Sequence, residues 1–255
     1  MGILDLGSIS WRIRNYGFLA AIKYLFKTGS SSHKLIFSDS LINLDYEGFI
    51  RLIEEKFSIS LLGFKDDIYL KNIELMESLR DIRKLNPVFS DLKDVVGRNA
   101  SIDRLLALWN LMLACRPRNI VETGTQFGVS AASMGKCKAE FNLSTSIDTF
   151  DVVANPLIAK SLVVDYHLMM SPVRKNFIKF LKELPYLDIF FHDSDHSYEN
   201  MLFEFAFAWD IMKCNILLSD DIDNNYAFAD FCRKRNLVGF RVLIEKGPAL
   251  GLILR

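Results

Sequence analysis

The chain has 255 residues, half of them hydrophobic, which suits one large domain or one domain with a small appendage. Its 31 basic and 31 acidic side chains cancel, so the composition gives no indication of nucleic-acid binding. The four cysteines form no CxxC pair and are typical of reduced thiols, with a disulfide or a zinc site as the less favoured alternative. No apolar run reaches the roughly 18 to 20 residues of a membrane span, and the first ten residues lack the pattern of a secretory signal. We therefore expect a cytoplasmic globular protein.

Residues 1–95 are expected to form a helical N-terminal segment. Helices are predicted at residues 10–27, 46–57 and 68–85, because apolar residues such as Phe49 and Ile53 recur there at helical spacing. The first stretch also carries basic residues and could lie on a membrane surface. We favour packing on the rest of the chain, as a cap over the substrate, or against a second subunit in a homodimer.

Residues 96–255 alternate between short apolar runs and stretches of helical length, which indicates a parallel sheet covered by helices. The predicted strands are residues 119–124, 144–150, 164–170, 187–195 and 215–221. The predicted helices are residues 102–115, 129–141, 173–184, 197–212 and 225–235. The tail, residues 239–255, has two strand-like runs around Lys246, Gly247 and Pro248 and predicts a closing hairpin.

The stretch "VETGTQFGVS", residues 121–130, predicts a ligand-binding turn after the first of these strands. It lacks the lysine that follows the second glycine of a P-loop, and the third glycine of the dinucleotide fingerprint. An acid, Glu122, stands two residues before the first glycine, where it would repel a phosphate. The turn therefore suits a cationic or hydroxyl-bearing ligand.

The ExGxxxG pattern resembles the S-adenosylmethionine (SAM) binding motif of class I methyltransferases. The resemblance implies a Rossmann-like parallel sheet whose last strand enters antiparallel through a hairpin, in agreement with the tail. It also implies that Glu122 helps to place the methionine end of SAM, and that Asp148, taken as the end of the second strand, holds the ribose hydroxyls. The alternative is a tight turn whose glycines serve geometry alone. The cofactor-binding residues expected from this motif are Glu122, Gly124, Thr125, Gln126, Gly128, Ser130 and Asp148.

Two acidic stretches, "FFHDSDHSYE" and "LLSDDIDNN", follow the predicted strands at 187–195 and 215–221. Ligands of open parallel sheets bind outside the carboxyl ends of the strands, so these acids would converge if the strands are neighbours. Clustered carboxylates favour a hard cation such as magnesium, calcium or manganese over zinc. Alternatively, Asp195 or Ser197 caps the next helix, and a solvated turn is formed by Asp221, Asp223, Asn224 and Asn225.

The stretch "HDSDHSYE" resembles the "DGDHSYE" signature of methyltransferases related to the sugar and macrolide O-methyltransferases. The resemblance implies that Asp193, Asp220 and Asp221 bind a divalent ion, most simply Mg2+. Asp195 is then the candidate general base, with His196 as its rival. The ion would lower the pKa of a substrate hydroxyl, whose oxygen attacks the methyl group of SAM.

The sequence thus predicts a SAM-dependent methyltransferase that acts on a hydroxyl of a small molecule or sugar, assisted by a divalent metal. One alternative is a metal-dependent hydrolase or hydroxylase that uses the same aspartates without SAM. Another is a non-catalytic SAM-binding accessory protein with a membrane-surface helix.

Overall fold

The computed structural model describes residues 40–85, 102–125, 128–152, 165–168, 173–244 and 248–255. The helix predicted at residues 10–27 and the residue Gln126 lie outside these ranges. Within them, no helix is both long enough and apolar enough to cross a membrane.

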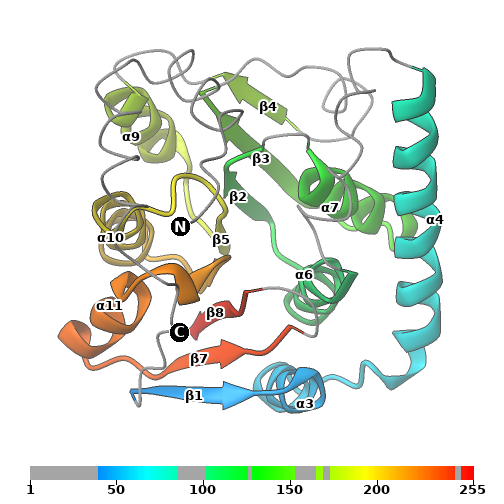
Figure 1. Cartoon of the computed structure of the whole chain (residues 1–255), viewed down its shortest axis with the longest axis horizontal. Helices are drawn as coiled ribbons and strands as arrows, with labels where there is room; N and C mark the ends of the chain where they lie inside the picture. Colours follow the sequence, from blue (N-terminus) through cyan, green and yellow to red (C-terminus); the bar gives the residue numbers. More distant parts are fainter. Residues whose placement is uncertain (1–39, 86–101, 126–127, 153–164, 169–172, 245–247) are drawn as a thin grey trace, which may run out of the picture. The chain divides into compact units, whose positions relative to one another are not determined.

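One eight-stranded sheet organises the described residues, in the order β1-β7-β8-β6-β5-β2-β3-β4 (Figure 1). Its strands are β1 (Leu41–Leu44), β2 (Asn119–Thr123), β3 (Ser146–Asp151), β4 (Asp165–Leu168), β5 (Ile189–His192), β6 (Ile216–Ser219), β7 (Gly239–Val242) and β8 (Leu250–Leu254). All neighbouring pairs are parallel except those of β8, which is antiparallel to both β6 and β7. The five predicted parallel strands and the closing hairpin are confirmed.

Strand β1 is the element that the sequence did not predict. It pairs in parallel with β7 at the edge of the sheet. Arg241 on β7 donates hydrogen bonds to both carboxylate oxygens of Asp223, at 2.8 and 2.7 Å, and to Asn43 on β1 at 3.4 Å. Residues 41–57 thus share a sheet and a core with the strands and helices after residue 101, and the boundary expected near residue 95 lies outside the described residues.

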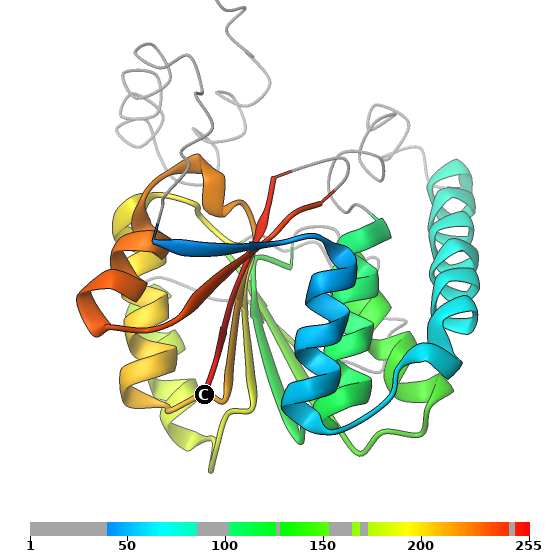
Figure 2. The same ribbon diagram turned by 90° about the horizontal axis from the view of Figure 1, so that it is seen from below.

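The two faces of the sheet are covered by different helices (Figure 2). One side carries α3 (Tyr46–Phe57), α4 (Lys65–Leu85), α6 (Ile102–Cys115) and α7 (Val129–Glu140). The other side carries α9 (Val173–Glu183), α10 (Tyr198–Ala206) and α11 (Ala227–Arg235). The short helical turns are η1 (Leu62–Phe64), the π-helical η3 (Phe207–Ile211) that continues α10, and η4 (Ile222–Asn224). The predicted helices at 46–57 and 68–85 are confirmed by α3 and α4.

Successive residues of each central strand point into two separate cores. Ile120 of β2 belongs to the cluster with Trp109 of α6, whereas Val121 belongs to the cluster with Phe205 of α10. Because both faces of the sheet are buried, the strands are continuous apolar runs without alternation. This burial stabilises the sheet. Because the strands themselves are buried, the polar side chains of a site are expected at the ends of the strands.

A buried polar chain fixes α4 to α6 and α7. The Trp109 indole donates to the Ser133 hydroxyl at 2.7 Å, and Ser133 donates to Asn72 Oδ1 at 2.9 Å. Polar groups removed from water destabilise a fold unless they are hydrogen-bonded, so this chain favours one relative placement of the three helices.

Candidate cofactor and metal site

The predicted site residues gather at the carboxyl ends of β2, β3, β5 and β6, which are neighbours in the sheet. Strand β2 pairs with β3 on one side and with β5 on the other. The strand order therefore reverses next to β2, and this kind of switch point is where open α/β sheets bind their ligands.

The turn after β2 requires its glycines for geometry. Gly124 has φ 91° and Gly128 has φ 77°, both in the left-handed region that favours glycine. The Gly124 amide donates to the carbonyl of Phe150 at 2.8 Å, and a Cβ at Gly124 would overlap the backbone carbonyl of Asp193. The first glycine thus holds the β2 turn directly against the loop that follows β5.

Glu122 is enclosed between β2, β3 and α7. Its carboxylate accepts hydrogen bonds from the hydroxyls of Ser130 and Thr149, the second at 2.5 Å. The Thr149 hydroxyl is also 2.6 Å from that of Thr125. Burial raises the pKa of Glu122 to about 7, although the two hydroxyls act against this. The carboxyl group can therefore change its charge near neutral pH.

Asp148 does not lie at the end of its strand, where the sequence placed it. It pairs opposite Val121, is buried, and accepts a 3.4 Å hydrogen bond from the hydroxyl of Ser146. Strand β3 continues to Asp151, one residue beyond Phe150, which pairs with Thr123. Asp151 is thus the acid at the carboxyl end of β3. The stretch "SIDTFD" contains both acids, so the second could have been considered.

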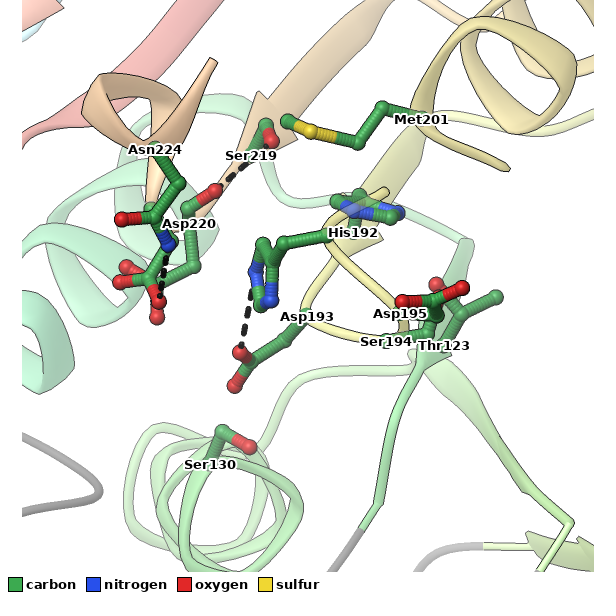
Figure 3. A network of polar contacts seen from close by, with 12 residues as sticks. Thr123, Ser130, His192, Asp193, Ser194, Asp195, Met201, Ser219, Asp220 and Asn224 are labelled. Atoms are coloured by element: carbon green, nitrogen blue, oxygen red, sulfur yellow. Dashed lines mark hydrogen bonds and ion pairs between the residues drawn. The ribbon is translucent and has the colours of Figure 1, made fainter. Parts of the chain in front are cut away.

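Asp193 and Asp220 stand side by side at the ends of β5 and β6. Their preceding residues, His192 and Ser219, are paired in the sheet, and the Asp220 amide donates to the His192 carbonyl at 2.9 Å. Figure 3 shows the two aspartates at these neighbouring strand ends. One ligand atom each of Asp193, His196 and Asp220 lies within 4.8 Å of the other two. The two acidic stretches therefore converge.

Asp221 is not part of this group among the described residues. It adopts φ 54° at the start of η4, and its Oδ2 accepts a 3.0 Å hydrogen bond from Asn224. His196, which the sequence suggested as a base, takes its place. Burial, together with the neighbouring His192, lowers the pKa of His196 to about 4, so its ring is neutral and can donate a lone pair at neutral pH.

A buried arginine that sequence reasoning missed enters the acidic group from α6. Nη1 of Arg104 lies 2.5 Å from Asp220 Oδ2, and its Nη2 lies 4.0 Å from Asp221 Oδ1. Burial raises the pKa of Asp220 to about 7, and the Arg104 charge opposes the rise. Burial and the nearby Asp220 also raise the pKa of Asp193 well above its usual value. One guanidinium therefore balances part of the charge of three carboxylates.

Residues 121–222 match the model of a protein family described as a methyltransferase domain. This segment of the chain is a methyltransferase domain. The matched segment runs from β2 to the start of η4 and includes the glycine turn, the first acidic stretch, and Asp220 and Asp221 of the second. No curated protein matches the chain.

Solved structures similar to the chain include CalS11, a TDP-rhamnose 3'-O-methyltransferase of calicheamicin biosynthesis, with 16% identity and a TM-score of 0.48 over 71% of this chain and 93% of that one. The SAH-bound methyltransferase PaMTH1 of Podospora anserina has 13% identity and a TM-score of 0.49, with 72% and 86% of the two chains covered. An O-methyltransferase from Klebsiella pneumoniae, itself described as putative, has 14% identity and a TM-score of 0.49, with 73% and 89% covered.

The acidic group of the methyltransferase domain fits a divalent cation. Asp220 Oδ1 and His196 Nε2 are buried and make no hydrogen bond within the part of the chain that the structure describes. Buried polar atoms without partners are rare, and an ion between them and Asp193 would satisfy both. Carboxylate oxygens suit magnesium or manganese, and an imidazole nitrogen moves the preference toward manganese and later transition metals.

Asp195, the predicted base, is exposed at the rim of the methyltransferase site. Its two carboxylate oxygens accept from the amide and the hydroxyl of Ser197, at 3.3 and 2.9 Å. Ser197 in turn is the N-cap of α10, where it accepts from the Asn200 amide. Of the two residues considered as a cap for this helix, Ser197 is the one that caps it, and Asp195 remains exposed beside it.

Glu204 of α10 connects the end of β2 to the loop after β5. Its carboxylate accepts hydrogen bonds from Thr123 at 2.7 Å, Ser194 at 3.0 Å and Asn200 at 3.1 Å, and it lies 2.7 Å from Nδ1 of His192. Burial alone would raise the pKa of Glu204, but His192 and these hydrogen bonds lower it overall. An anionic Glu204 therefore fastens the end of β2 to the loop after β5.

Proposed function

We propose that this methyltransferase transfers the methyl group of SAM to a hydroxyl of a small molecule or sugar, with the help of a divalent cation. The observation that carries the proposal is the convergence of Asp193, His196 and Asp220 within 4.8 Å, directly beside the glycine turn. A methyl donor held at that turn and an acceptor oxygen held at the acidic group would lie next to each other, as an in-line transfer requires.

For the cofactor, we propose that the glycine turn receives SAM, with Glu122 near its methionine end. The ribose hydroxyls are assigned to an acid of β3. Asp151 is the stronger candidate because it ends the strand, whereas Asp148 lies three residues earlier and is buried. Thr125, Gly128 and Ser130 line the same turn and would shape the space for SAM.

For the acceptor, Asp193, Asp220 and His196 are proposed to hold the cation. When bound, the ion would polarise the acceptor hydroxyl and lower its pKa. His196 then serves as a ligand, and Asp195 is left as the proposed base because its carboxylate is exposed at the rim of the same loop. The positive charge of Arg104 opposes the rise that burial causes in the pKa of Asp220, and so favours the ionised carboxylate that a cation needs.

The test is calorimetric titration of the purified chain with SAM, with and without Mg2+ or Mn2+, and with NAD as the control nucleotide. We expect SAM to bind under both conditions and NAD to show no heat of binding. Release of S-adenosylhomocysteine on addition of pooled hydroxylated acceptors would then identify the substrate class. A chain that binds NAD and not SAM would refute the proposal.

The double variant Asp193→Asn with Asp220→Asn tests the metal part separately. We expect it to lose Mn2+ binding, measured by electron paramagnetic resonance, because both carboxylate ligands become neutral amides. SAM binding should persist, since neither side chain belongs to the proposed cofactor turn. Unchanged Mn2+ binding in the double variant would show that Asp193 and Asp220 do not hold the metal.

A further inference from the structure

The acidic group of this protein contains a positive charge of its own. Arg104 is buried, with 6% of its surface exposed, and its Nη1 lies 2.5 Å from Asp220 Oδ2. Its second terminal nitrogen lies 4.0 Å from Asp221 Oδ1. An arginine cannot lose its proton in a protein, so this charge is permanent.

The two oxygens of Asp220 have different surroundings. Oδ2 faces the guanidinium, whereas Oδ1 is buried and makes no hydrogen bond to any described residue. Oδ1 is thus the oxygen that remains for a cation shared with Asp193 and His196. Arginine and a divalent ion can occupy the same carboxylate from opposite sides, but they repel each other at short distance in a site with little water.

We propose that Arg104 is the resident counter-ion of the metal site, and that its charge weakens the binding of a divalent cation to Asp193, His196 and Asp220. The inference rests on the proposed function, because it concerns the same cation site. Without a bound metal, Arg104 keeps the carboxylate pair from being an uncompensated buried charge, which would destabilise the fold. With a metal, the same charge makes binding readily reversible.

A different role for Arg104 would be purely mechanical. If the guanidinium served only to orient Asp220, removing it would loosen the carboxylate and weaken metal binding, as loss of outer-shell partners usually does. The charge and the orientation therefore predict opposite changes in metal affinity when a neutral side chain replaces Arg104. Lysine, which keeps the charge and loses the planar fork, separates the two further.

The experiment is a titration of the full chain with Mn2+ at pH 8, followed by electron paramagnetic resonance, on wild type, Arg104→Gln and Arg104→Lys. Arg235→Gln is the matched control, because Arg235 of α11 pairs with Asp210 of η3 and with none of the acids of the site. We expect Arg104→Gln to bind Mn2+ about tenfold more tightly than wild type, and Arg104→Lys to stay within about threefold. Arg235→Gln should not change the affinity.

Equal or weaker Mn2+ binding by Arg104→Gln would overturn the inference. If Arg104→Gln does not fold, Arg104→Met removes the same charge without introducing an amide, and the same comparison applies. SAM binding is measured on every sample. If SAM binds but Arg104→Gln and wild type have the same Mn2+ affinity, the role of Arg104 is contradicted and the methyltransferase proposal stands. If the two proteins differ in Mn2+ affinity as expected but SAM does not bind, only the proposed function is contradicted.

Discussion

The substitution Glu122→Gln should change how the stability of this protein depends on pH. Glutamine has nearly the same shape as glutamate but stays neutral at every pH. Glu122 is fully buried, and its pKa is raised from the ordinary 4.5 to about 7. Below pH 4.5 the carboxyl is protonated in both the folded and the unfolded chain, so its ionisation contributes nothing to the free energy of unfolding.

Between pH 4.5 and 7 the unfolded chain releases the proton of Glu122 while the folded chain retains it. Stability therefore falls as the pH rises through this window, and above pH 7 the whole penalty is present. The difference between 4.5 and about 7 corresponds to about 3 kcal/mol of unfolding free energy. Glu122→Gln lacks this ionisation, so its stability relative to wild type should rise by about 3 kcal/mol from pH 4.5 to pH 8.

The assay is urea unfolding of both proteins at several pH values, followed by tryptophan fluorescence. The raised pKa of Asp220 is present in both proteins and cancels in the difference. The Glu122 charge is one of the causes that raise the pKa of Asp193, so its removal lowers that pKa and adds to the gain of the variant at high pH. A difference that stays constant from pH 4.5 to pH 8 would refute the reasoning, because it would mean that Glu122 titrates alike in the folded and the unfolded chain.

Three further substitutions test the geometry of the site. Gly124→Ala should lower the unfolding free energy, measured by urea unfolding, by at least about 2 kcal/mol. The added Cβ would overlap the backbone of Asp193, and the φ of residue 124 is 91°, which strains alanine. An unchanged unfolding free energy would contradict the tight turn. Glu204→Ala should lower it by about 3 kcal/mol, since it leaves several buried donors without their acceptor, whereas Glu199→Ala at an exposed position of α10 should have little effect. Asp151→Asn should weaken SAM binding in calorimetry more than Asp148→Asn does; the opposite order would return the ribose contact to Asp148.

Much of the fold was predictable because its signals are local. Each central strand is buried on both faces, so it reads as a short apolar run between polar ends. Strand β1 has no such signal: of its four residues only Leu41 is buried, and Ile42 is half exposed. Its partner β7 lies about 200 residues further along the chain, and the pattern of residues within β1 does not predict that pairing.

The acids of the site were predictable for a related reason. Parallel strands end at the same edge of the sheet, so Asp193 and Asp220 had to be near each other once β5 and β6 were neighbours. Arg104 and Glu204 were missed because they lie within helices that otherwise read as apolar packing surfaces. A charge in such a helix is a signal, but its partner depends on how that helix is placed on the sheet.

Strand β1 also decides what kind of edge the sheet presents. Without it, β7 would offer its free backbone amides and carbonyls to any other extended chain. With it, the exposed rim is only four residues long, and short edge strands resist the pairing of one sheet with another. Shortening the chain beyond Leu44 would therefore be expected to yield a protein that aggregates through β7, even though every residue of the methyltransferase site would still be present.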